Sequence, residues 1–309
     1  MPPEATNFGA LKQGMVDSSR HGERMKLASC VGTLATGAVL AVAALALGPL
    51  LSWAVLVAPH AVFIDARSRT AQIHLINTGS TPEECSIELK FGYPDTDSAG
   101  NIFVRLIDDP EGEQAQASAA GWIRAYPRGV VVQPGTQQLV RLLAQPPSTL
   151  PDGEYWTRLI VTSRGAQTSG SGTDSLARAG VEFVVSTVIS VTYRNGAVST
   201  GVTLNEFRAA VEHDSLVVRL GLAREGNAAY LGTARVLLRD AAGNVRGRWG
   251  TPIAVYYALN RRLALPLEGE LSPGSYVAQL DLMTQRDDIP QSSVLPAAPI
   301  QQTVALEVR

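Results

Sequence analysis

Histidine and cysteine, the side chains that most often do chemistry in proteins, are few and widely separated in this chain. Three of the four histidines, His60, His74 and His213, have no spacing that matches a set of metal ligands. The two cysteines, Cys30 and Cys85, cannot make a four-ligand zinc site of their own. No Gly-x-Ser-x-Gly, phosphate-loop, His-Glu-x-x-His or Cys-x-x-Cys motif occurs. We therefore predict that the protein is not an enzyme, with no catalytic residue, cofactor or metal.

One acidic cluster could hold a cation. It consists of Asp108, Asp109, Glu111 and Glu113, and carboxylate oxygens suit hard cations. A proline and a glycine are interspersed among these residues. That composition is typical of a solvated loop, and we favour this interpretation.

Composition excludes several classes of protein. The 309 residues include 26 basic and 28 acidic ones, a net charge of −2, whereas a nucleic-acid binder would usually show a basic excess. Hydrophobic residues make up 45% of the chain, so disorder over its whole length is excluded. We expect a globular protein with no nucleic-acid partner.

The N-terminal part carries an apolar segment that suits export. No Asp, Glu, Lys or Arg occurs from Leu27 to Ile64, and three basic residues lie directly before that run. A Gly48-Pro49 breaker and a site of small residues follow the most apolar part, so the pattern predicts a secretory signal peptide that is cleaved after Ala54. We assign residues 1–54 to an N-terminal extension with this signal.

Two other interpretations of that segment stay open. The absence of charge continues past Ala54, so the segment could instead be an uncleaved transmembrane anchor. A lipoprotein signal at Cys30 is the third interpretation, although this cysteine precedes the apolar run. In all three cases the protein is exported, and it meets a membrane only through its N-terminal segment.

The rest of the chain has the pattern of an all-β protein. Short runs rich in Val, Ile, Leu and Thr are separated by Gly, Pro, Asn and Asp, and Ile73 and Leu75 alternate with polar residues as in a strand with one buried face. Only Thr203–Val211 suggests a turn or two of helix. A turn pair at Asn195-Gly196 follows the longest β-like run, so we place a boundary there. We predict two tandem immunoglobulin-like β-sandwich domains, 55–195 and 196–309.

An internal echo supports this division. Leu150-Pro151-Asp152-Gly153-Glu154-Tyr155 and Leu271-Ser272-Pro273-Gly274-Ser275-Tyr276 have Leu, Gly and Tyr at the same spacing, each before an alternating strand. Immunoglobulin-like sandwiches often carry a tyrosine whose hydroxyl bonds back to the preceding backbone. We expect Tyr155 and Tyr276 to form two such corners.

Several segments resemble the N-terminal domain of periplasmic pilus-assembly (fimbrial) chaperones, the PapD-like family. They are HAVFIDARSRTAQIHLINTG, Tyr126-Pro127 followed by VVVQPGTQQLVRLL, Leu150-Pro151 with Glu154 and Trp156, and VEFVVSTVISVTYRN. The resemblance covers about residues 55–195. It implies a periplasmic chaperone that lends an edge β-strand to a secreted, pilin-like subunit, as in chaperone–pilin complementation.

The resemblance places the donor strand in the last β-run of the first domain. Its alternating side chains would fill the groove of the subunit; they are Val181, Phe183, Val185, Thr187 and Ile189. The same run also reads as an ordinary core strand, because its other face holds Val184 and Val188. The loop before it, Thr162–Gly180, is unusually long for a compact domain. The donor and core interpretations both stay open.

The family binds the terminal carboxylate of the subunit with an arginine and a lysine, which make charge-assisted hydrogen bonds to it. Alignment by the motifs places His60 at the arginine position and Ser190 at the lysine position, a departure from the pattern. Arg194 or Arg67 could substitute, or the protein binds no carboxylate. The alternative to a chaperone is a structural or adhesive module of the cell envelope.

Overall fold

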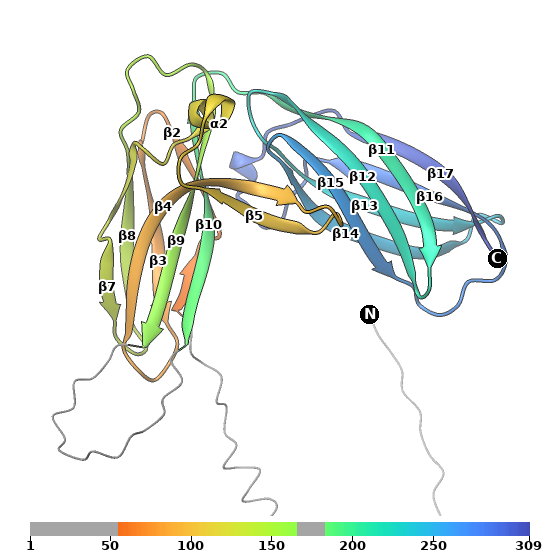
Figure 1. Ribbon diagram of the computed structural model, residues 1–309, viewed down its shortest axis with the longest axis horizontal. Coiled ribbons are helices and arrows are strands. Elements are labelled where there is room, and N and C mark those ends of the chain that lie inside the picture. Colours follow the sequence, from red (N-terminus) through yellow and green to blue (C-terminus); the bar gives the residue numbers. More distant parts are fainter. Residues whose placement is uncertain (1–54, 166–182) are drawn as a thin grey trace, which may run out of the picture. The chain divides into compact units, whose positions relative to one another are not determined.

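The computed structural model describes residues 55–165 and 183–309 (Figure 1). Regular structure in these residues is almost entirely β-strand, which confirms the all-β fold; the exceptions are the short helix α2 (Gly112–Ala117) and the turn η1 (Gln291–Ser293). The predicted signal peptide or anchor, residues 1–54, lies outside the described residues. Among the described residues, no helix is long and apolar enough to cross a membrane.

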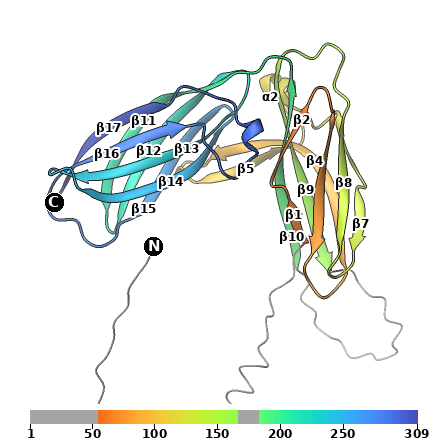
Figure 2. The same ribbon diagram turned by 180° about the vertical axis from the view of Figure 1, so that it is seen from behind.

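The first sandwich consists of two sheets that face each other across a core. One sheet has the strand order β1 (Val55–Ala58), β3 (Thr70–Asn77), β8 (Gln137–Ala144) and β6 (Ile123–Tyr126). The other has the order β2 (Ala61–Asp65), β10 (Val184–Asn195), β9 (Gly153–Gly165), β4 (Glu83–Thr96) and β5 (Ile102–Ile107), with β7 (Gly129–Val132) paired to β4. The chain thus changes sheets between β1 and β2, and β1 is labelled in Figure 2.

The core of this sandwich follows from the alternation of its strands. Ile73 and Leu75 of β3 are fully buried, as their pattern predicts, and they pack in one cluster with Leu142, Leu159 and Ile189. Successive side chains of a strand point to opposite faces, so each strand contributes every second residue to the core.

The second sandwich has the same construction. Its first sheet contains β11 (Thr200–Glu212), β12 (Ser215–Gly226) and β15 (Ala258–Pro266), and its second contains β14 (Val245–Val255), β13 (Tyr230–Asp240), β16 (Gly274–Met283) and β17 (Ile300–Val308). The helical turn expected at Thr203–Val211 is wrong, because these residues belong to β11 and pair with β12, with one shift of register between Leu204 and Glu206. Strand pairing overrides a weak local preference.

Both tyrosine corners are present. The hydroxyl of Tyr155 donates a hydrogen bond of 2.9 Å to the carbonyl of Pro151, and that of Tyr276 donates one of 2.9 Å to the carbonyl of Ser272. Each bond spans four residues and closes the turn before a late strand. The repeat seen in the sequence therefore has the same structural meaning in both sandwiches.

The candidate subunit-binding edge

Strand β10 is paired along one edge for its whole length and along the other edge for only part of it. With β9 it is antiparallel from Val184 to Asn195. With β2 it is parallel, and only from Ser190 to Arg194. In the described part of the chain, no strand pairs with the second edge of Val184–Ile189. We call this stretch the open edge; its backbone groups are positioned to accept another strand.

The side chains along the open edge change from exposed to buried toward its end. Phe183, just before β10, is 61% exposed, and Val184 is 58% exposed. Val185 and Thr187 are half-buried, whereas Ile189 is fully buried. The core interpretation therefore holds from Ile189 onward. Among the described residues, Val184–Val188 pairs with another strand along one edge only, and the side chains of Val184 and Val188 are exposed. Val181 lies outside the described residues.

The two positions proposed for a carboxylate anchor meet where the open edge ends. The amide of Ser190 donates to the carbonyl of His60, with an N···O distance of 3.3 Å, and the Ser190 hydroxyl lies 3.3 Å from the Tyr256 hydroxyl. His60 itself is exposed. Serine is uncharged, so the pair provides hydrogen-bonding groups at this point but no permanent positive charge.

The two arginines considered as substitutes lie elsewhere. Arg67 is exposed in the turn after β2. The Nε of Arg194 lies 2.7 Å from a carboxylate oxygen of Glu154 and is held there. Its guanidinium also lies over the ring of Phe63, with 4.9 Å between its central carbon and the ring centre. The guanidinium of Arg194 is therefore engaged by Glu154 and Phe63 within the protein.

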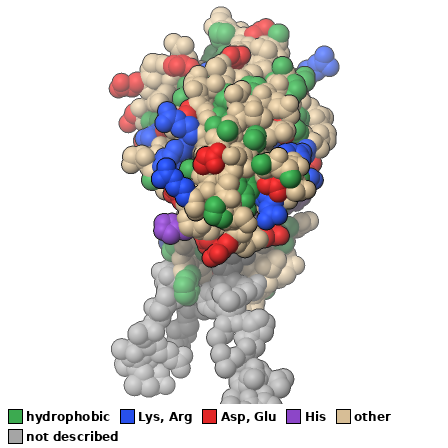
Figure 3. Space-filling model, turned by 90° about the vertical axis from the view of Figure 1, so that its right-hand side faces the viewer, with side chains coloured by type: hydrophobic (Ala, Val, Ile, Leu, Met, Phe, Trp, Pro, Cys, Tyr) green, Lys and Arg blue, Asp and Glu red, His purple; other side chains and the backbone are tan. Residues whose placement is uncertain are grey.

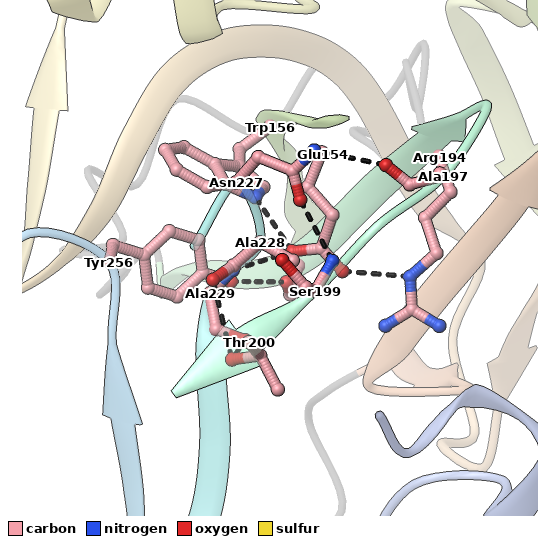
Figure 4. A network of polar contacts seen from close by, with 11 residues as sticks. Glu154, Trp156, Arg194, Ala197, Ser199, Thr200, Asn227, Ala228, Ala229 and Tyr256 are labelled. Atoms are coloured by element: carbon pink, nitrogen blue, oxygen red, sulfur yellow. Dashed lines mark hydrogen bonds and ion pairs between the residues drawn. The ribbon is translucent and has the colours of Figure 1, made fainter. Parts of the chain in front are cut away.

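Glu154 is the centre of a buried network that joins β9 to the second sandwich (Figure 4). Its side chain is only 1% exposed and accepts three hydrogen bonds. Arg194 Nε donates at 2.7 Å, Trp156 Nε1 at 3.2 Å, and the backbone amide of Ala229 at 2.9 Å. Nearby, Asn227 bonds to the carbonyls of Asp152 and Ala197. Both sandwiches belong to one compact unit, and these contacts fix the end of β10 within it.

An aromatic cluster lies beside this network. The ring centres of Trp156 and Tyr256 are 4.8 Å apart, and those of Tyr93 and Tyr257 are 4.8 Å apart, both in edge-to-face geometry that favours aromatic pairs. Burial raises the pKa of the Tyr257 hydroxyl, so that group stays neutral. The cluster places apolar and neutral groups next to the anchor positions.

Sequence reasoning missed a cation at this point, Arg158. It lies directly opposite Ser190 on β9, so their side chains share a face. Arg158 is only 5% exposed, and its guanidinium carbon lies 5.0 Å from the ring centre of Tyr256. The sequence held one signal, since Arg158 lies two residues after Trp156 and therefore on the same face of the strand. That face of the strand reads as solvent-exposed, however, because the residues that cover it belong to the second sandwich.

Elsewhere the protein surface has mixed charge. Figure 3 shows basic and acidic side chains interspersed with apolar ones on the face that it displays. In the described residues, no group of three or more His, Cys, Asp or Glu side chains could hold a metal ion.

Comparison with known proteins gives likenesses in structure only. No family model matches the sequence, and no curated protein matches it. Among solved structures, the CupB2 chaperone of Pseudomonas aeruginosa is 12% identical, with 81% of this chain and 100% of that chain covered and a TM-score of 0.42. The YadV chaperone is 12% identical, with 82% and 99% covered and a TM-score of 0.41.

A third structure is the CsuC-CsuE complex of a chaperone with a tip subunit, from archaic chaperone-usher pili of Acinetobacter baumannii. It is 18% identical, with 67% of this chain and 88% of that chain covered and a TM-score of 0.36. The chain is similar to these chaperones, but the sequence identities are too low to assign a function. Its function is therefore inferred from its own residues.

Proposed function

We propose that the protein is an exported chaperone that binds a secreted, pilin-like subunit by adding the open edge of β10 to the incomplete sheet of that subunit. One observation carries the proposal: Val184–Ile189 is unpaired along one edge, among the described residues, and apolar side chains are exposed beside it. An apolar open edge promotes aggregation unless a partner covers it.

The energetics of this edge suit a binding strand. Main-chain hydrogen bonds would supply affinity, and alternate side chains in pockets would supply specificity. Each of Phe183 and Val185 would contribute about 1.5–3 kcal/mol if complete burial in the subunit replaced full exposure. Their present partial burial, and the ordering of the segment, lower that gain. The proposed contact set remains Val181, Phe183, Val185, Thr187 and Ile189.

The proposal includes the place and organisation of the protein. The signal pattern in residues 1–54 supports export to the periplasm, where a secreted subunit would be met; an uncleaved segment would anchor the protein to the inner membrane. We propose 55–195 as the subunit-binding domain and 196–309 as its companion. We also propose that the protein has no nucleic-acid partner and that it contacts a membrane only through its N-terminal segment.

The test is Phe183→Asp in the exported full-length protein. A charge at this exposed position should abolish co-purification of secreted subunits, as identified by mass spectrometry, and should leave thermal unfolding nearly unchanged. Val131→Asp is the matched control, because Val131 is also exposed (44%) and lies in β7 of the same sandwich. We expect this variant to retain the partners.

Two results would contradict the proposal. Loss of folding in Phe183→Asp would show that the residue belongs to the core, and the protein would then be a structural envelope module. Equal partner recovery from both variants would show that binding does not use the β10 edge.

A further inference from the structure

Three arginines form a row across one face of the second sandwich. In the strand register, Arg208 of β11 is opposite Arg219 of β12, and Arg219 is opposite Arg262 of β15. Residues opposite each other in neighbouring strands point to the same face of the sheet, and like charges in such pairs repel each other. This row is therefore stabilised where negative charge lies among its members.

The two outer arginines of the row have acidic partners, and the middle one has none. Arg208 Nε lies 3.0 Å from Glu206 Oε1, and a terminal nitrogen of Arg262 lies 2.9 Å from a carboxylate oxygen of Glu212. Within residues 55–165 and 183–309, no carboxylate lies within 4.0 Å of the exposed guanidinium of Arg219. The positive charge of the row is thus least compensated at its centre.

A cavity of about 180 Å³ lies at this centre. Its walls come from the arginine row, from β15 and from the turn between β4 and β5; they include Arg219, Arg261, Arg262, Asp97, Ser98 and Gly100. A water molecule occupies about 30 Å³ in the liquid, so the cavity has room for an ion of several heavy atoms.

The turn between β4 and β5 is fixed against β15. The amide of Arg262 donates to the carbonyl of Gly100 at 2.9 Å, and the amide of Asn260 donates to the hydroxyl of Thr96 at 3.1 Å. Gly100 has a φ of +84°, and a Cβ there would lie 2.7 Å from the Cβ of Arg262. Glycine permits both the conformation and the close approach. Backbone contacts therefore hold this wall of the cavity in place.

Arg261 brings a second unpaired cation to the cavity. It precedes Arg262 in β15, so the two side chains leave the strand on opposite faces. The Arg261 side chain is half-buried, and in the part of the chain that the structure describes it forms no ion pair. Burial lowers the pKa of its guanidinium, although an arginine stays protonated in proteins. A charge that has lost part of its water without gaining a partner is stabilised by a counterion.

The acidic groups at the cavity are already engaged. Glu206 is held by Arg208. The Asp97 carboxylate accepts hydrogen bonds from the amides of Ala99 (2.9 Å) and Asn101 (2.8 Å) and from the side chain of Asn101 (3.1 Å). These bonds lower the pKa of Asp97, so it stays ionised. Three arginines against two carboxylates leave the lining with a net charge of +1.

We propose that this cavity binds a small tetrahedral oxyanion, of the phosphate or sulfate class, through the guanidinium groups of Arg219, Arg261 and Arg262. Guanidinium groups match such oxyanions in charge and in hydrogen-bond geometry. Arg262 and Arg261 leave β15 on opposite faces, so the donors approach from different directions. A tetrahedral anion presents oxygens in all these directions, whereas the two oxygens of a carboxylate lie in one plane. The site uses no residue of the open edge and is separate from the proposed subunit binding.

Isothermal titration calorimetry on the full-length protein tests this proposal. The anions are phosphate, sulfate and acetate, with chloride added to keep the ionic strength constant. We expect one phosphate or sulfate ion to bind per chain, and acetate to bind at least roughly 10-fold more weakly. Arg219→Met and Arg261→Met should each weaken phosphate binding roughly 10- to 100-fold, the range expected for hydrogen bonds to a charged group.

Two comparisons separate the site from general effects of charge and folding. Arg248→Met is the matched control, because Arg248 is an exposed arginine of β14 in the same sandwich and lies outside the cavity lining; this variant should keep its affinity for phosphate. Arg219→Met removes a repulsion from the row. Without added anion, it should unfold at the same temperature as the unchanged protein or higher, so its loss of binding would not reflect a loss of fold.

Four results would overturn the proposal. They are no saturable binding of phosphate or sulfate to the unchanged protein, unchanged phosphate binding in either Arg219→Met or Arg261→Met, an equal loss of binding in Arg248→Met, and acetate binding as tight as phosphate binding. Each of these results leaves the co-purification of secreted subunits as a separate measurement. The proposed function is therefore tested independently of the anion site.

Discussion

Removal of the Glu154 carboxylate should destabilise the protein strongly. Glu154→Ala leaves the guanidinium of Arg194, which is 16% exposed, without its partner, and removes the acceptor for Trp156 Nε1 and for the amide of Ala229. Breaking a buried ion pair by deleting one partner costs about 3–5 kcal/mol. Trp156 Nε1 and the Ala229 amide belong to the same network and lose their acceptor in the same substitution. We therefore expect the free energy of unfolding to fall by about 3–5 kcal/mol in total.

Urea unfolding measures this loss. Trp156 is a buried reporter beside Glu154, so its fluorescence should follow the transition. The matched control is Glu84→Ala, which breaks the ion pair of Glu84 with Arg164. Both of those side chains are about half exposed (50% and 54%), so the loss there should be about 0–1 kcal/mol.

The reasoning would be refuted by a small effect. If Glu154→Ala lowers the free energy of unfolding by no more than Glu84→Ala does, the buried network contributes nothing beyond an ordinary surface pair. A double-mutant cycle with Arg194→Met would then locate the error, since it separates the coupling of the pair from the cost of the unpaired charge.

Three further predictions concern the tyrosine hydrogen bonds, the space around two glycines and the buried thiol. Tyr155→Phe and Tyr276→Phe should each lower the free energy of unfolding by about 0.5–1.5 kcal/mol, because each removes one closing hydrogen bond; no loss in either variant by urea unfolding would contradict this. Gly92→Ala should destabilise by about 1–3 kcal/mol, since its Cβ would lie 2.5 Å from the Arg105 carbonyl oxygen. Gly250→Ala, with open space around its Cβ, should not. Cys85 is buried, and desolvation raises the pKa of its thiol to about 11, so native protein should resist thiol reagents at neutral pH; rapid labelling before unfolding would be inconsistent with that burial. Because the thiol pKa is raised from 9.0 to about 11 in the folded protein, burial of the neutral thiol favours the folded state at a pH below 9.0. That contribution to the free energy of unfolding should be lost as the pH rises from 9.0 to about 11.

Local features of the fold could be predicted from the sequence. The alternation around Ile73 and Leu75 defined a strand and its buried face, and the Gly-x-Tyr repeats placed both tyrosine corners. Such features depend on residues a few positions apart, which the sequence displays directly. The weak pattern at Thr203–Val211 misled for the same reason, since only pairing with β12 made it a strand.

What depends on residues far apart in the chain was decided by the tertiary structure. The sequence indicated that the last run of the first domain was apolar on both faces. It could not show that β2 pairs with β10 only from Ser190 onward, and that limit creates the open edge. Arg158 shares a strand face with Trp156, and its charge is typical of an outward-facing residue of an ordinary strand. It is buried because Tyr256, almost a hundred residues later, covers it. Strand pairing and coverage by a second sandwich bring distant residues together, so composition and local spacing alone could not predict either feature.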